Sequence, residues 1–203
     1  LGNLFARIGS GSMPFLIPLF LQISLGYTPF NAGLMMLPVA AASMMSKPLA
    51  TGIIKRIGYR HMLIGNTMLV GLSMAGFALI SPGSSLALCV VFLALFGAIN
   101  SMQFTAMNTV ALKDLDGSLA SGGNSLLSMV MMLSMSLGVA SAGAVLTYFK
   151  DHFGAQAGVQ ALSAFHAPFI CVGLITLASA WIFWQLSPDE PISENRATHT
   201  DIG

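Results

Sequence analysis

The sequence predicts an all-α integral membrane protein with six transmembrane helices. Of its 203 residues, 55% are hydrophobic and only 7% are charged. A soluble domain carries about 25% charged residues, so this chain cannot cover its surface with groups that water solvates. Its eight Lys and Arg residues against seven Asp and Glu residues leave no basic surface for nucleic acid. The composition also excludes a disordered chain and a secreted disulfide scaffold.

Six apolar segments are long enough to cross a bilayer, which takes about 20 residues each. They cover approximately residues 3–25, 30–50, 61–81, 86–110, 122–148 and 167–186. Short breaks rich in Gly, Pro and charged residues separate them. Residues 1–187 therefore form one six-span bundle, and residues 188–203 form a polar tail. Because the first apolar run is already under way at Leu1, we expect the chain to be part of a longer polytopic protein.

The distribution of Lys and Arg predicts the orientation. One side of the membrane receives only Lys150, and the other receives Lys55, Arg56, Arg60, Lys113 and Arg196. Cytoplasmic loops carry the excess of Lys and Arg in membrane proteins. The second side is therefore predicted to be cytoplasmic, and the C-terminal tail lies on that side.

Two cations fall within the first two spans. Arg7 lies in the first span, where Gly9, Gly11, Pro14 and Pro18 weaken the helix as a gating helix would require. Arg7 either snorkels to the interface or faces a central cavity, where it would hold an anionic group or pair with an acid. Lys47, near the end of the second span, is interpreted mainly as a snorkelling side chain.

The fourth span carries a polar stripe. At about 100° per residue, Asn100, Gln103, Met107 and Asn108 fall within one arc of roughly 140°. Amides in hydrocarbon need partners, so the stripe is either the wall of a polar cavity or a set of interhelical hydrogen bonds. Gln22, near the end of the first span, is a further candidate for the cavity wall.

The predicted spans contain no set of residues that would form a catalytic site or a metal site. All seven carboxylates lie in loops or in the tail, and the four His residues are scattered along the chain. No Ser has a His and an acid placed beside it, and no cluster has metal-ligand spacing. In the fifth span, Ser134, Gly138 and Ala142 recur every four residues, which predicts close helix packing or a sliding helix contact.

Residues 48–60, between the second and third spans, carry a recognisable motif. Arg56, Gly58 and Arg60 resemble the signature loop of the major facilitator superfamily, which lies between the second and third spans of each half. Thr51 stands at the first Gly position of that signature and Lys55 at the position of its acid. The second half of such a transporter often carries a degenerate copy of the signature, so these departures favour a C-terminal half.

Two further stretches, residues 7–33 and residues 120–125 leading to 137–140, are similar to the drug:proton antiporter family with fourteen spans. The resemblance implies the C-terminal half of a bacterial inner-membrane exporter that is driven by the proton gradient and needs no other cofactor. Its partners would be the lipid bilayer, a small-molecule substrate and the N-terminal half, which in that family carries the coupling carboxylates.

The resemblance also implies roles for the candidate residues. The first and fourth spans would line the substrate cavity with Arg7, Gln22, Asn100, Gln103 and Asn108. Arg56, Gly58 and Arg60 would latch the cytoplasmic face. Multidrug efflux is the function typical of the family. Two alternatives stay open: an exporter of an anionic metabolite or its metal chelate, favoured by Arg7 and Lys47 without a nearby acid, and a stand-alone six-span module without transport activity.

Overall fold

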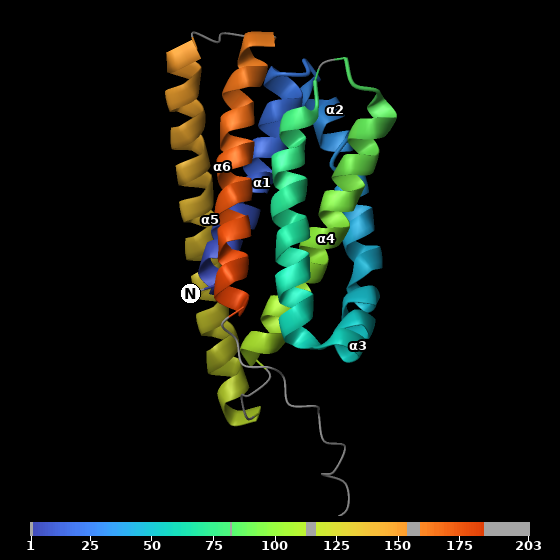
Figure 1. The fold of residues 1–203 in the computed structure, drawn as a ribbon, viewed down its shortest axis with the longest axis vertical. Helices are drawn as coiled ribbons and strands as arrows, with labels where there is room; N and C mark the ends of the chain where they lie inside the picture. The colour runs from blue at the N-terminus through green and yellow to red at the C-terminus, as the bar shows by residue number, and fades with distance from the viewer. Residues whose placement is uncertain (1, 82, 113–116, 154–158, 185–203) are drawn as a thin grey trace, which may run out of the picture.

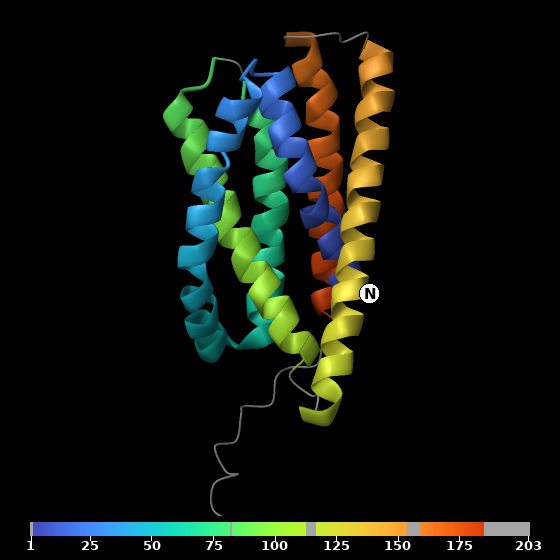
Figure 2. The same cartoon turned by 180° about the vertical axis from the view of Figure 1, so that it is seen from behind.

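The computed structural model describes residues 2–81, 83–112, 117–153 and 159–184, and these residues are helical apart from short connections. The elements are α1 (Gly2–Ile23), α2 (Pro29–Leu34), α3 (Leu37–Gly76), the 3₁₀ turn η1 (Phe77–Leu79), α4 (Leu86–Leu112), α5 (Gly117–Phe153) and α6 (Val159–Trp184). Figures 1 and 2 show the long helices packed side by side along one common direction.

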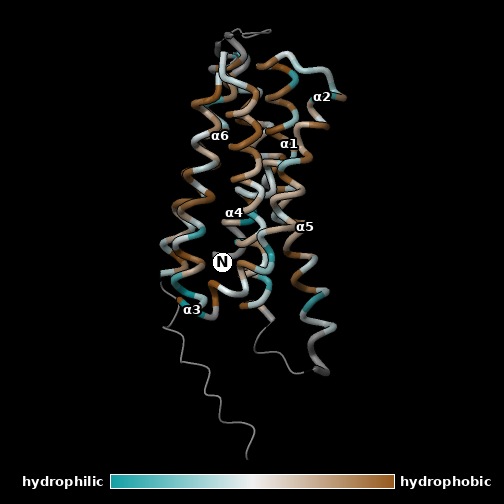
Figure 3. Tube along the Cα trace, turned by 90° about the vertical axis from the view of Figure 1, so that its right-hand side faces the viewer, coloured by the Kyte–Doolittle hydropathy of each residue, from teal (hydrophilic) through white to brown (hydrophobic). Residues whose placement is uncertain are grey.

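Five segments of the described residues are long and apolar enough to cross a membrane, judged by length and composition. They are Pro29–Ile54, Arg56–Leu79, Leu86–Ala111, Ser121–Phe149 and Ala164–Trp184. Helix α1, which contains Arg7, is not among these five. Figure 3 shows hydrophobic residues along most of each helix, whereas hydrophilic residues gather at the lower end of α3. This distribution is the one expected of a bundle whose middle lies in lipid.

Helix α3 is a hairpin of two helical arms. Helical backbone angles persist on both sides of Gly58, which alone departs from them with φ 78° and ψ 164°. The two arms then run in opposite directions, as Figures 1 and 2 show. The sequence predicted a longer connection over residues 51–60. The connection is shorter because a positive φ, which Gly adopts without a steric penalty, reverses the chain at a single residue.

Buried aromatic rings hold one end of the bundle together. The ring of Phe169 on α6 lies 5.3 Å from that of Phe20 on α1 and 5.4 Å from that of Phe77 on η1. All three side chains are almost completely buried. Edge-to-face and stacked ring pairs add to the burial of apolar surface. This cluster fixes α1 against α6 at the end of the bundle remote from the α3 turn.

Small residues bring three pairs of helices into close contact. A Cβ built on Gly97 of α4 would lie 2.8 Å from the Cα of Val39 on α3. One on Gly11 of α1 would lie 2.7 Å from the Cα of Met135 on α5, and one on Gly173 of α6 would lie 2.9 Å from the backbone oxygen of Gly71 on α3. Helix α1 therefore packs on α5 and α6, and α4 packs mainly on α3.

Candidate functional site

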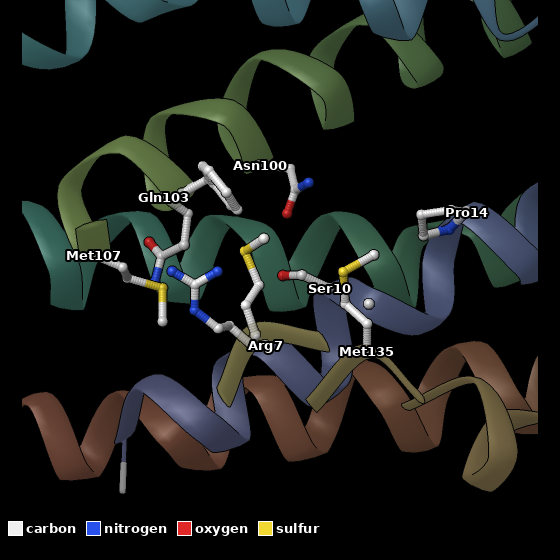
Figure 4. A pocket seen from close by; sticks show the side chains of 10 residues that line it. Arg7, Ser10, Pro14, Asn100, Gln103, Met107 and Met135 are labelled. Carbon is white, nitrogen blue, oxygen red and sulfur yellow. The ribbon is translucent and has the colours of Figure 1, made fainter. Parts of the chain in front are cut away.

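A cleft of about 180 Å³ lies where α1, α4 and α5 converge. Figure 4 shows its walls from close by, with side chains from the three helices directed toward one another. Its lining combines one cation, two amides, one hydroxyl and three thioethers with small and aromatic residues, namely Arg7, Ser10, Gly11, Pro14, Asn100, Gln103, Phe104, Met107, Met131 and Met135. A mostly apolar concave site with a few polar groups is the usual form of a small-molecule site.

Arg7 reaches across the cleft from α1 to α4. Its Nη2 donates a hydrogen bond to Oδ1 of Asn108, and the centre of its guanidinium lies 4.9 Å from the centroid of the Phe104 ring. The side chain is only 4% exposed. An amide oxygen and an aromatic face both stabilise a guanidinium without cancelling its charge. Arg7 therefore links α1 to α4 through side chains at the cleft.

Gln103 lines the same cleft, but its amide group is bonded to α3. Its Nε2 donates to Oγ1 of Thr67 at 2.6 Å, and its Oε1 accepts from Nδ2 of Asn66 at 2.9 Å. Asn66 Nδ2 also lies 2.9 Å from the backbone oxygen of Ile99. These groups are buried. The network satisfies amides that would otherwise be costly in hydrocarbon, and it fixes α4 to the second arm of α3.

Three methionine side chains form a conformationally adaptable part of the cleft wall. Met107 comes from α4, and Met131 and Met135 come from α5. Figure 4 shows the sulfur atom of Met135 on the same side as Ser10, and that of Met107 beside Gln103. Methionine is unbranched and polarisable, so it adapts its shape to different partners. Such a wall can accept apolar bodies of different shapes.

Not all the predicted residues meet in the cleft. Arg7, Asn100 and Gln103 line it, and Asn108 adjoins it through its bond to Arg7. Gln22 lies in the last turn of α1, outside this lining.

The predicted loop motif lies at the turn of α3, away from the cleft. Arg56 and Gly58 are on the arm that ends there, and Arg60 begins the second arm. Nη2 of Arg60 donates to the backbone oxygen of Trp184 at 2.8 Å. The motif therefore joins the turn of α3 to the end of α6.

The sequence reasoning missed Phe104, Ser10 and the two methionines of α5. At about 100° per residue Phe104 falls between Asn100 and Asn108 in the arc of the polar stripe, so the helical period could have included it. Met131 and Met135 are four residues apart and so share one helix face. That spacing shows they lie together, but only the packing of α5 on α1 shows which cavity they reach.

The chain matches the model of the Major Facilitator Superfamily over residues 2–139. It is also similar to proteins named "Putative multidrug resistance protein MdtD" from enterobacteria. The identity is 43% with the protein of Yersinia enterocolitica over 96% of this chain and 42% of the relative. It is 44% with that of Pectobacterium atrosepticum over 93% of this chain and 40% of the relative. It is 43% with that of Serratia proteamaculans over 92% of this chain and 39% of the relative.

The chain thus spans about two fifths of the length of these relatives. The match to the family covers more than half of the chain, and it confirms the resemblance that the loop over residues 48–60 indicated. The helices with membrane-spanning length and composition agree with it. This chain belongs to the major facilitator superfamily, whose members are multi-pass membrane transporters and not enzymes.

Proposed function

We propose that the chain is the C-terminal six-span half of a secondary transporter that exports small molecules across the bacterial inner membrane. The transport is alternating access driven by proton antiport. In this proposal α1 is the sixth span beside the five apolar segments, residues 1–187 are the bundle, and residues 188–203 are a cytoplasmic tail. The observation that carries the proposal is the cleft between α1, α4 and α5, with Arg7 bridging two of its walls.

The packing around the cleft supports alternating access. Helix α1 is packed on α5 and α6, α4 on α3, and α3 on α6, whereas α1 and α4 meet across the cleft through the side chains of Arg7 and Asn108. A side-chain link can break and re-form while the helix contacts on either side persist. The partner half would close the cleft from the other side and supply the coupling carboxylates.

The α3 turn is proposed to latch the cytoplasmic face. Arg60 ties this turn to α6 through the carbonyl of Trp184. Gly58 lets the two arms of α3 meet at this end, and Arg56 is exposed beside it. A rigid connection of α3 with α6 would let the end of the bundle move as one body when the halves rock.

The substrate class follows from the cleft wall. The adaptable methionine thioethers beside Phe104 can contact apolar substrates of different shapes, which supports multidrug efflux. The names of the relatives support the same function. The charge of Arg7 favours the second candidate, an anionic metabolite or its metal chelate. Arg7 is a buried cation that lines the cleft.

The two candidates differ in whether the parent protein exports a carboxylate and in whether Arg7→Ala abolishes that export. The complete transporter would be reconstituted in liposomes with an imposed pH gradient, and export of a fluorescent lipophilic cation and of a fluorescent carboxylate would be measured. If the substrate is an anion, carboxylate export falls more than about tenfold, because a buried charge partner is lost, and cation export persists. If the substrates are varied drugs, cation export is retained and no carboxylate is exported by the parent protein.

Lys47→Ala is the matched control, because it removes an exposed cation from the first arm of α3. It should leave both rates unchanged. Equal loss of both activities in Arg7→Ala would make Arg7 a structural residue. Absence of any substrate movement coupled to protons in the parent protein would contradict the antiporter itself.

A further inference from the structure

We propose that the end of the bundle formed by the α3 turn and the last turn of α6 binds the phosphate group of an anionic phospholipid. This site, which we call the basic–aromatic patch, consists of Arg56, Arg60, Trp181 and Trp184. It lies at the α3 turn, and it does not depend on what the cleft transports. The proposal rests on three features of the patch, namely its position along the membrane normal, its charge and its exposed aromatic rings.

The ends of three apolar segments place the patch at a membrane interface. One segment ends at Ile54, the next begins at Arg56, and a third ends at Trp184. The hydrogen bond from Arg60 to the carbonyl of Trp184 shows that these ends lie together in space. Figures 1 and 2 show the α3 turn and the end of α6 in the same lower part of the bundle. The patch is thus at the depth of lipid headgroups.

The aromatic rings on α6 have the exposure expected of a lipid contact. Trp181 is 71% exposed and Trp184 is 60% exposed, although both are large and largely apolar. They are three residues apart, so they are neighbours on one face of the helix. Tryptophan is enriched at membrane interfaces, where its ring contacts acyl chains and its N–H group contacts headgroups. The two rings would flank the glycerol region of a bound lipid.

The charge of the patch selects an anionic headgroup. Arg56 is exposed, and the bond of Arg60 to Trp184 holds a second guanidinium at the same end. Arginine binds phosphate through a planar fork of N–H donors. Basic groups at a membrane surface attract anionic lipids, and each contributes about fivefold in affinity.

The two tryptophans of this chain are a built-in reporter, because both belong to the patch. The complete transporter, with tryptophans outside this chain replaced by Phe, would be reconstituted in phosphatidylcholine bilayers. Phosphatidylglycerol or phosphatidylcholine with brominated acyl chains would then be added in equal fractions. Bromine quenches tryptophan at short range, so brominated phosphatidylglycerol should quench several times more than brominated phosphatidylcholine.

Arg56→Gln tests the charge without disturbing the bond of Arg60 to α6. The preference for phosphatidylglycerol should fall about fivefold. Lys47→Gln is the matched control, since it removes the same charge from an exposed position nine residues earlier on α3, and the preference should persist. Arg60→Lys keeps the charge but loses the fork, so it should retain part of the preference.

Three results would overturn the lipid site. Equal quenching by the two lipids in the parent protein would show that the patch does not select anions. An unchanged preference in Arg56→Gln, or an equal fall in Lys47→Gln, would show that selection occurs elsewhere. Abolition of the quenching by inorganic phosphate, at ionic strength matched with chloride, would identify a soluble anion as the ligand instead.

Discussion

Two helix contacts in this bundle are built by different means. Between α3 and α4, hydroxyl and amide side chains bond across the contact. Ser43 Oγ donates to the carbonyl of Gly97 at 2.9 Å, and Ser101 Oγ donates to the carbonyl of Ser43 at 2.8 Å. The bonds of Gln103 to Asn66 and Thr67 continue this set. Gly97 adds a close backbone approach to this set, whereas between α1 and α5 the contact is made by such approaches alone among the contacts described, at Gly11 and Gly138.

The difference shows that one bundle in lipid can combine a helix contact fixed by hydrogen bonds with a helix contact formed by small residues. Apolar side chains gain little by leaving lipid for another helix, so close packing and hydrogen bonds provide the association. Hydrogen bonds fix the register of α4 on α3, because each donor must meet one acceptor. A contact of small residues tolerates small shifts along the helix axis. Arg7 and Asn108 connect α1 to α4 across the cleft.

The largest effect is expected from Gly138→Ala, which disrupts the close contact between α1 and α5. A Cβ at this position would overlap the backbone carbonyl of Ile8 and lie 3.2 Å from the backbone nitrogen of Ser12. Backbone cannot move aside as a side chain can, so α1 must separate from α5. We expect a loss of about 1–3 kcal/mol of stability, measured by thermal unfolding in mild detergent.

Gly143→Ala on the same helix is the control, because a Cβ there would meet nothing within 4 Å. It should leave stability unchanged or raise it by up to about 1 kcal/mol, since Ala favours helix over Gly. If both variants unfold at the parent temperature, α1 and α5 do not depend on this close approach.

A smaller effect is expected from Asn66→Leu, which breaks the hydrogen-bonded contact. It removes the bonds from Nδ2 to Gln103 and to the carbonyl of Ile99. Interhelical hydrogen bonds in membranes contribute about 0.6 kcal/mol each and up to about 1.7 kcal/mol, so we expect a loss of about 1–2 kcal/mol in the same unfolding experiment.

Thr109→Val serves as its control, because the hydroxyl of Thr109 is exposed and bonds only to the carbonyl of Thr105 in its own helix among the bonds described. It should have almost no effect on stability. An equal loss in both variants would mean that α3 and α4 gain nothing specific from the Asn66 network.

The smallest effect is expected from Ser101→Ala, which removes one bond of the α3–α4 set and leaves the others. Its hydroxyl donates to the carbonyl of Ser43. Loss of one such bond costs about 0.5–1 kcal/mol. Combining it with Asn66→Leu in a double-mutant cycle would sharpen the comparison, since cooperative bonds give a coupling energy and independent bonds give none.

The composition and the long apolar runs were enough to predict a helical membrane protein, because lipid leaves a spanning backbone few alternatives to the helix. The loop around Arg56, Gly58 and Arg60 indicated the family that the comparison then showed. The helical period placed Asn100, Gln103 and Asn108 on one face of α4. Each of these inferences depends on local sequence, and local sequence is what periodicity and motifs report.

The tertiary structure decided which partner each polar group takes. The stripe on α4 left cavity wall and interhelical bonding as alternatives, and the structure contains both, since Gln103 bonds to α3 and Asn108 bonds to Arg7. Met131 and Met135 reach the cleft because α5 packs on α1. A buried amide takes the donor or acceptor nearest in space, and nearness between helices is set by packing along the whole bundle.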